Sequence, residues 1–318
     1  MRAVLIVNPN ATSTTPAGRD LLAHALESRV ELVVTHTDHR GHAIEIAEAA
    51  KRDGIDVIIV HGGDGTVNEV VNGLLGTPGQ DRPAAGELPA VSVVPGGSAN
   101  VFARALGISA DPIEATNQLI DLLGEHRRGE PWRRIGLMDC VERWAVFTAG
   151  MGVDGDVVAA VEAQRAKGRK VTAGRYVRIG FREMLTKVRS DPLLTVHMPD
   201  HEPISGVYFA FVSNASPWTY VNSRPVWTNP GTTFDTNLGI FAVTSMNTVA
   251  NLLLVRRMLS RKAKIEARHL IREDDLPWVR ITAAEPIACQ IDGEFLGKRE
   301  EMTFTSVPDA LAVVAPAD

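Results

Sequence analysis

Two glycine-rich segments constrain the fold of this chain more than any other feature, because each lies between a short apolar run and a helical pattern. The first, HGGDGT at 61–66, follows the apolar run at 56–60, and the second, PGGSAN at 95–100, follows the run at 91–94. After the first segment, apolar residues fall at 67, 70, 71, 74 and 75, which is the period of an amphipathic helix. Strand, glycine turn and helix in this order predict a parallel sheet covered by helices.

The rest of the chain divides into two kinds of pattern. Apolar runs at 4–7 and 32–35 predict two more strands of the same sheet, and Asp111-Pro112 predicts the start of a helix that runs to about Leu123. We place a domain boundary in the following GEHRRGEP. Beyond it, short strand-like pieces alternate with turns, so the second half is predicted to be mostly β, with a basic helical insertion near 157–188.

The composition favours a globular protein of two domains. The chain has 318 residues, 45% of them hydrophobic and 22% charged, which disfavours disorder and coiled coil. We expect a cytosolic protein, because no apolar run approaches the roughly 18 residues of a membrane span and the apolar start is too short for a signal peptide. Cys140 and Cys289 are expected to be buried thiols, without a zinc site. The nine histidines are interpreted as scattered surface or core residues.

Charge is concentrated in two basic segments. Residues 165–189 hold nine Lys/Arg against one acid, and residues 256–268 hold six against one, although the whole chain has a net charge of −5. In 165–189 apolar residues are interleaved with the cations, as in an interfacial helix, and we predict that both segments bind an anionic membrane surface. The alternative is a solvated charged face. A nucleic-acid partner is not expected, since aromatic residues make up only 5% of the chain and no RNA-binding signature is present.

The glycine segments have the composition of phosphate-binding loops. Glycines allow the backbone to approach a ligand, and the N-terminus of the following helix suits an anion. Asp64 in such a loop suggests Mg²⁺ coordination or a place next to the nucleophile; the alternative is a sharp turn with Asp64 as the N-cap. Ser98 could bind a phosphate or cap its helix. There is no GxxxxGK[ST], and no GxGxxG follows the first strand, so the sequence supports neither a Walker-type NTPase nor a conventional dinucleotide fold.

Five motifs in fixed order, VNPNA, GGDGTVNEVVNGLL, PGGSANVFARALGI, AGMGVDGDVV and QIDGE, resemble the diacylglycerol kinase catalytic-domain family of bacterial lipid kinases. The resemblance implies an α/β plus β fold. An N-terminal, NAD kinase-like parallel-sheet domain at 1–128 would bind ATP, and a C-terminal β-sandwich domain at 129–302 would bind the lipid. It further implies a strand near 303–318 that returns to the first domain, and a homodimer is possible by analogy with family members.

The resemblance also implies the site residues, with ATP and Mg²⁺ as cofactors. The catalytic acids would be Asp64 and the pair Asp292 and Glu294, which serve as the general base or lie next to it. The nucleotide would be bound by Asn8, Ala11, Thr12, Thr37, Gly62, Gly63, Gly65, Thr66, Asn68, Glu69, Ser98 and Asn100. A structural Mg²⁺ site is doubtful: Asp235 remains, but Gly239 replaces a second acid. Ser98, Ala99 and Val101 also depart from the usual PxGTGNDFAR.

The activity that these motifs predict is transfer of the γ-phosphoryl group of ATP to the hydroxyl of diacylglycerol, at a membrane to which the protein binds peripherally and reversibly. A sphingoid base or another lipid alcohol is the first alternative substrate. A lipid-binding or regulatory protein with little catalysis, and a kinase of a soluble metabolite such as NAD, are the other two alternatives.

Overall fold

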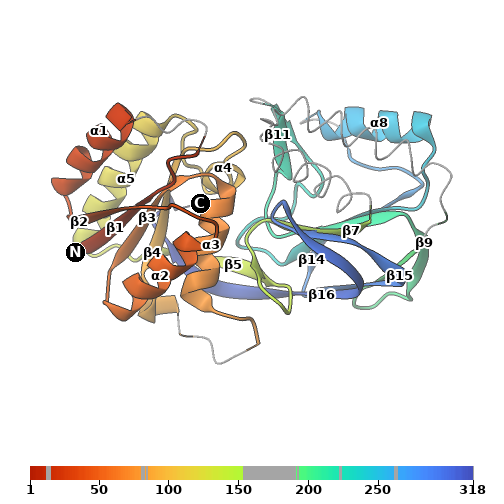
Figure 1. Ribbon diagram of the computed structural model, residues 1–318. Helices are drawn as coiled ribbons and strands as arrows, with labels where there is room; N and C mark the ends of the chain where they lie inside the picture. The colour runs from red at the N-terminus through yellow and green to blue at the C-terminus, as the bar shows by residue number, and fades with distance from the viewer. Residues whose placement is uncertain are drawn as a thin grey trace. The chain divides into compact units, whose positions relative to one another are not determined.

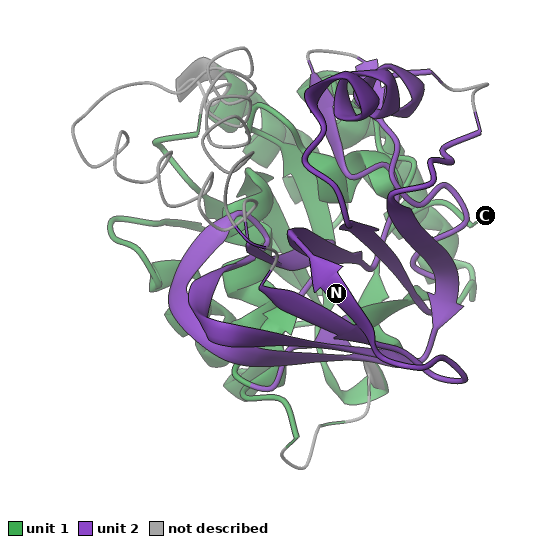
Figure 2. Cartoon of the chain, turned by 90° about the vertical axis from the view of Figure 1, so that its right-hand side faces the viewer, with its two compact units in different colours: residues 1–137, 142–144, 308–318 green, residues 138–141, 145–307 purple. Residues whose placement is uncertain are grey.

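The structure, a computed structural model, describes residues 1–11, 16–79, 83, 85–152, 191, 193–221, 224–260 and 264–317. The chain forms two compact units, which Figure 2 shows in different colours. Unit 1 contains residues 1–137, 142–144 and 308–318, and unit 2 contains residues 138–141 and 145–307. Each unit is described by itself below.

Unit 1 is built on a parallel sheet with the strand order β2-β1-β3-β4. The strands predicted in the first third of the chain are all present, as β1 (Arg2–Val7), β2 (Glu31–His36), β3 (Val57–Gly62) and β4 (Ala90–Pro95). Strands β3 and β4 are buried along their whole length, as expected for the centre of a sheet covered on both faces. The end of β16 (Glu294–Val313) lies parallel to β4, with Val313 opposite Val91.

Helices cover both faces of this sheet (Figure 1). On one face lie α1 (Pro16–Glu27) and α5 (Pro112–Arg127), and on the other lie α2 (His42–Arg52) and α3 (Asp64–Leu75). Helix α4 (Val101–Ala105) and the 3₁₀ turn η1 (Ala85–Glu87) are short. The predicted cap of α5 is confirmed, because the Asp111 side chain accepts hydrogen bonds from two backbone N–H groups of the first turn. The helix continues past Leu123 to Arg127, where a shorter one was expected.

Unit 2 is mostly antiparallel. Its strands follow the order β14-β13-β10-β7-β15-β16, and β8 and β9 continue from β15. The bounds are β7 (Thr148–Gly152), β8 (Leu194–His197), β9 (Ile204–Val207), β10 (Phe209–Ser213), β13 (Leu238–Val243), β14 (Leu270–Leu276) and β15 (Trp278–Ile291). A separate hairpin, β11 (Thr219–Val221) and β12 (Arg224–Val226), and helix α8 (Thr248–Met258) complete the unit. Strand β5 (Arg133–Asp139), the short β6 (Trp144–Ala145) and β16 each contain a crossing between the units.

The predicted fold class, α/β followed by β, is therefore confirmed. Cys140 and Cys289 are buried thiols, as expected. The predicted basic helical insertion and the segment 165–189 lie outside the described residues. Among the helices that the structure describes, none combines the length and the apolar character needed to cross a membrane.

Candidate functional site

Four loops of unit 1 leave the same edge of the parallel sheet. They follow the carboxyl ends of β1 at Asn8, of β2 at Thr37, of β3 at Gly63 and of β4 at Gly96. The chain runs from β1 to β2 on one side and to β3 on the other, so the strand order reverses between β1 and β3. Ligands of open parallel sheets bind at such a reversal, outside the carboxyl ends of the strands. The sequence elements predicted to bind phosphate thus lie at the edge where a ligand is expected.

The two glycine loops contact each other through their backbones. A Cβ atom added to Gly97 would lie 2.8 Å from the Cα atom of Gly63, which no side chain can tolerate. The N–H of Gly96 donates to the carbonyl of Gly62 at 2.8 Å. Asn100 closes its own loop, since its side chain accepts from the N–H of Gly97 at 2.9 Å and donates to the Gly97 carbonyl at 2.8 Å. The glycine at position 97 is therefore explained by the packing of the chain itself.

Gly65 and Ser98 differ from Gly97, because no contact within the described chain requires a glycine at position 65 or a serine at position 98. Gly65 is exposed in the first turn of α3, and an added Cβ atom would meet nothing within 4 Å. Ser98 is exposed in the second loop, and within the described residues its hydroxyl has no hydrogen-bond partner. Glycine has a lower helix propensity than alanine. A bound group that needs close approach to the backbone would explain the glycine at this position.

Asp64 links the two glycine loops. It is the first residue of α3, whose N-cap is Gly63, so the alternative in which Asp64 caps its own helix is wrong. Its carboxylate accepts from the N–H of Phe102 at 3.0 Å, at the start of α4. Burial raises the pKa of Asp64 above its ordinary value, although the N–H groups of that turn and the Arg104 guanidinium oppose the rise. A cation beside the carboxylate would offset the cost of its burial.

Three polar residues of α3 hold neighbouring segments in place. The hydroxyl of Thr66 accepts from the Asn8 side chain at 3.1 Å. Asn68 is buried, donates to the carbonyl of Trp144 at 3.1 Å and contacts the Arg143 guanidinium through its side-chain oxygen. The Glu69 carboxylate accepts two backbone N–H groups at the start of α2, from Gly41 at 3.0 Å and from Ala43 at 3.3 Å. These side chains build the loops of the site from within unit 1.

The other residues predicted to bind nucleotide lie in the loops after β1 and β2. The Asn8 side chain accepts from the N–H of Asn10 at 2.9 Å, and the N–H of Ala11 donates to the Asn8 carbonyl at 3.1 Å, which together form a tight turn. Thr12 lies outside the described residues. Thr37 is buried directly after β2, and its N–H donates to the carbonyl of Val7.

In unit 2, Asp292 occupies a two-residue turn between β15 and β16. Asp292 and Gly293 have φ of 47° and 79°, values typical of the tight hairpin turn that suits twisted strands. The carboxylate is buried and accepts three backbone N–H groups, from Val146 at 2.6 Å, Phe147 at 3.0 Å and Thr148 at 2.9 Å. The hairpin turn that the sequence QIDGE predicts is therefore present. The carboxylate of Asp292 also holds the segment before β7 in place through these hydrogen bonds.

Ser213 is a polar residue near Asp292 that the sequence analysis did not select. In the sheet of unit 2, Ser213 pairs with Thr148 on one side and with Gly239 on the other, and Thr148 bonds Asp292. The side chain of Ser213 is fully buried, and its hydroxyl has no partner among the described residues. The signal was present in the sequence as a polar SNASP directly after the apolar run of β10. Glu294, the first residue of β16, is partly buried.

Asp235 is exposed, and its N–H donates to the Thr233 hydroxyl at 3.2 Å. Within the described parts of the chain, Asp235 does not belong to any group of three side chains that could converge on a metal ion. The missing acid at Gly239 has a packing cause, because an added Cβ atom there would lie 2.2 Å from the Thr232 hydroxyl oxygen.

Comparison with known proteins agrees with this geometry. Residues 2–128 match the family model "Diacylglycerol kinase catalytic domain". A "Probable lipid kinase YegS-like" of Chromohalobacter salexigens is 39% identical over 111 residues, which is 35% of this chain and 33% of that protein. The chain thus aligns with about a third of that relative's length. A protein of the same name from Stenotrophomonas maltophilia is 26% identical over 94% of this chain and 91% of its own length.

The fold is also that of a solved structure. The crystal structure of a diacylglycerol kinase from Bacillus anthracis has a TM-score of 0.71 and 19% sequence identity, with 99% of this chain and 97% of that chain covered. At this identity the likeness shows the fold alone. The family match covers the four loops of unit 1 and both glycine segments, so residues 2–128 of this chain belong to the diacylglycerol kinase catalytic domain family.

Proposed function

We propose that this protein is a lipid kinase that transfers the γ-phosphoryl group of ATP to the hydroxyl of diacylglycerol or a related lipid alcohol. The observation that carries the proposal is the pair of glycine loops at one sheet edge, in which the exposed Gly65 has no role in the packing of the chain. Membership of the diacylglycerol kinase catalytic domain family and the lipid kinase names of the relatives support it.

In this proposal unit 1 binds the nucleotide. Gly65 and Ser98 face the phosphates, with the loops around them shaped by the remaining residues of the predicted set: Asn8, Ala11, Thr12, Thr37, Gly62, Gly63, Thr66, Asn68, Glu69 and Asn100. Asp64 would hold Mg²⁺. A carboxylate next to phosphate fits this ion, because Mg²⁺ is commonly bound by one or two carboxylates together with substrate phosphates. When bound, the ion neutralises charge on the transferring group.

Unit 2 would present the lipid hydroxyl to the acids of its β15–β16 turn. Phosphoryl transfer to an alcohol requires a group that accepts the hydroxyl proton, and a carboxylate within hydrogen-bond reach is suited to this role. We assign the role to the pair Asp292 and Glu294. The three backbone hydrogen bonds fix the Asp292 carboxylate in one orientation, and the buried hydroxyl of Ser213 is proposed to help position the acceptor.

The lipid substrate lies in a membrane, so the protein needs a surface that contacts the bilayer. In unit 2, helix α8 has such a surface. This helix buries Asn251, Leu254 and Met258, and most of the residues that it exposes before its last turn are apolar. Val249, Leu252, Leu253 and the following Leu259 are 69%, 60%, 54% and 45% exposed. Figure 1 shows α8 on the same side of unit 2 as β11. Soluble helices normally place charged residues on such a face.

Cations and aromatic residues adjoin this apolar face. Arg256 and Arg257 follow it in the last turn of α8. A hollow of about 480 Å³ is lined by Leu259 together with Tyr220, Arg224, Pro225 and Trp227. Tyr and Trp favour the membrane interface, and arginine favours anionic headgroups. We propose that α8 and the basic segment 256–268 dock on an anionic bilayer, together with segment 165–189.

Flotation with anionic liposomes at low salt tests the docking. Leu252→Asp with Leu253→Asp should reduce the bound fraction at least fivefold, because each change places a charge on the face that enters the bilayer. Ile113→Asp is the matched control, since Ile113 is 62% exposed on α5 and no contact with lipid is proposed there. Equal flotation of the wild type and the double variant, or no flotation of the wild type, would contradict the proposal.

Nucleotide binding tests the role of Gly65 directly. Gly65→Ala should fold at least as well as the wild type, because the new methyl group meets no atom of the chain. Its Kd for ATP should nevertheless rise at least tenfold. Gly124→Ala is the control, since Gly124 is also helical, and its added Cβ would lie 3.7 Å from the flexible Arg128 side chain. If both variants bind ATP like the wild type, the proposed placement of the phosphates is wrong.

A further inference from the structure

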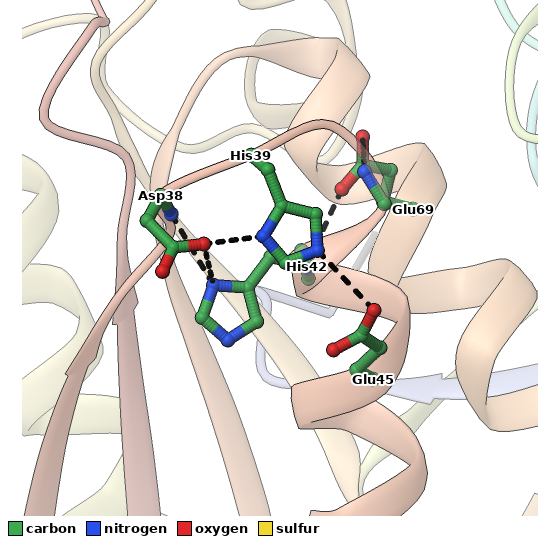
Figure 3. A network of polar contacts seen from close by, with 7 residues as sticks. Asp38, His39, His42, Glu45 and Glu69 are labelled. Atoms are coloured by element: carbon green, nitrogen blue, oxygen red, sulfur yellow. Dashed lines mark hydrogen bonds and ion pairs between the residues drawn. The ribbon is translucent and has the colours of Figure 1, made fainter.

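The loop between β2 and α2 brings three metal-binding side chains together. Asp38, His39 and His42 each offer a ligand atom, and these atoms lie within 4.8 Å of one another. Nδ1 of His39 contacts Oδ1 of Asp38, and Nδ1 of His42 lies 2.8 Å from the same oxygen. The two imidazole rings are stacked, with centroids 4.7 Å apart (Figure 3). The sequence predicted scattered histidines, but His39 and His42 lie together in this loop.

Hydrogen bonds around this group fix which ring nitrogens carry lone pairs. Nε2 of His39 lies 3.2 Å from Oε1 of Glu45, so it must be the protonated nitrogen that donates to the carboxylate. In a neutral ring, Nδ1 of His39 then carries the lone pair. Nδ1 of His42 accepts the backbone N–H of Asp38 at 3.2 Å, so this nitrogen is unprotonated, and an ion that binds it would replace this hydrogen bond. Two ring nitrogens and an anionic oxygen thus converge, and a cation stabilises this arrangement, either as a proton on Nδ1 of His39 or as a metal ion.

We infer that Asp38, His39 and His42 bind a divalent transition-metal ion of the Zn²⁺, Co²⁺ or Ni²⁺ class. Two imidazole nitrogens and one carboxylate oxygen form a donor set that these ions prefer and that Mg²⁺ does not. Glu45 supplies the carboxylate that typically orients a metal-binding histidine through its second nitrogen. Asp38 and His39 are largely exposed, so solvent or another ligand completes the coordination.

The surrounding backbone is held in position for this role. The Glu69 carboxylate accepts the N–H of Gly41 at 3.0 Å and the N–H of Ala43 at 3.3 Å, which are the residues on either side of His42 (Figure 3). A site whose ligands are fixed before binding loses less conformational freedom when the ion arrives. None of the three ligands belongs to the residues assigned to phosphoryl transfer, but the site borders the proposed nucleotide loops, because Thr37 directly precedes Asp38 and Glu69 holds the backbone on either side of His42.

Calorimetric titration of the full chain, without a histidine tag, tests this inference with Zn²⁺ and Co²⁺, and visible absorption reports the coordination of Co²⁺. We expect one ion per chain. His39→Ala and His42→Ala should each weaken binding at least tenfold, and Glu45→Gln should weaken it by about tenfold through the orientation of His39. His24→Ala is the control, since His24 is 88% exposed on α1.

A tenfold excess of Mg²⁺ should leave the Zn²⁺ titration unchanged. The inference is overturned if the wild type shows neither heat of binding nor Co²⁺ absorption. In that case a proton on His39, and not a metal ion, stabilises the three side chains. It is also overturned if His42→Ala, with an unchanged circular dichroism spectrum, binds the ion as tightly as the wild type does. Both readouts are independent of kinase activity, so failure of the proposed function would not affect them.

Discussion

Replacing Asp292 by asparagine should destabilise the protein as well as change its activity. The carboxylate accepts three backbone N–H groups at 2.6, 3.0 and 2.9 Å. The amide oxygen of asparagine can replace Oδ1 for Phe147 and Thr148, but its NH₂ group then faces the N–H of Val146. A hydrogen bond to a charged group contributes about 1.5–3 kcal/mol, and a neutral one about 1 kcal/mol. Loss of one bond and weakening of two give a decrease of about 3 kcal/mol in the free energy of unfolding.

Urea unfolding followed by circular dichroism and tryptophan fluorescence measures this decrease. Asp200→Asn is the matched control, because Asp200 is also an aspartate of unit 2 with positive φ but is exposed. Its free energy of unfolding should stay within about 0.5 kcal/mol of the wild type. If Asp292→Asn unfolds within about 1 kcal/mol of the wild type, the backbone bonds do not contribute as argued. The activity of Asp292→Asn is therefore measured under conditions in which urea unfolding shows that the variant is folded.

Two further predictions concern unit 1. Gly97→Ala should lower the free energy of unfolding by about 1–3 kcal/mol, because the new Cβ would lie 2.8 Å from the Cα of Gly63; an unchanged urea midpoint would contradict this. Burial lowers the pKa of His61 from its ordinary value of 6.5, so the folded state resists its protonation and wild-type stability should fall as the pH drops below about 6.5. Urea unfolding at pH 7 and pH 5 should show a smaller loss for His61→Gln, by up to about 1.4 kcal/mol per pH unit, and an equal loss would refute the assignment.

The strands and glycine turns of unit 1 could be predicted because their signals are local. The apolar run before HGGDGT, the helical period after it and the cap at Asp111 each involve neighbouring residues, and all three are present in the structure. The side-chain partners could not be predicted, because they depend on distant segments. Asp64 bonds the N–H of Phe102, and Gly63 contacts Gly97, although the sequence suggested a ligand for both.

The same limit applies to the turn at Asp292 and to the histidines. A hairpin turn and an acidic motif both fitted QIDGE, and only the pairing of β15 with β7 shows why the buried carboxylate meets the N–H groups at 146–148. His39 and His42 are three residues apart, a spacing visible in the sequence. Their convergence on Asp38 depends on the backbone of the β2–α2 loop, which Glu69 holds from another helix.

The central claim is tested most directly by the activity of Asp64→Asn. Because burial already raises the pKa of Asp64, a neutral amide that can still accept the N–H of Phe102 should fold as well as the wild type at pH 7. The measurement is transfer of radiolabelled phosphate from ATP, with Mg²⁺, to detergent-dispersed diacylglycerol, resolved by thin-layer chromatography. We predict labelled lipid with the wild type and at least 100-fold less with Asp64→Asn at an unchanged urea midpoint. No labelled lipid with the wild type, or equal transfer by the variant, would contradict the account.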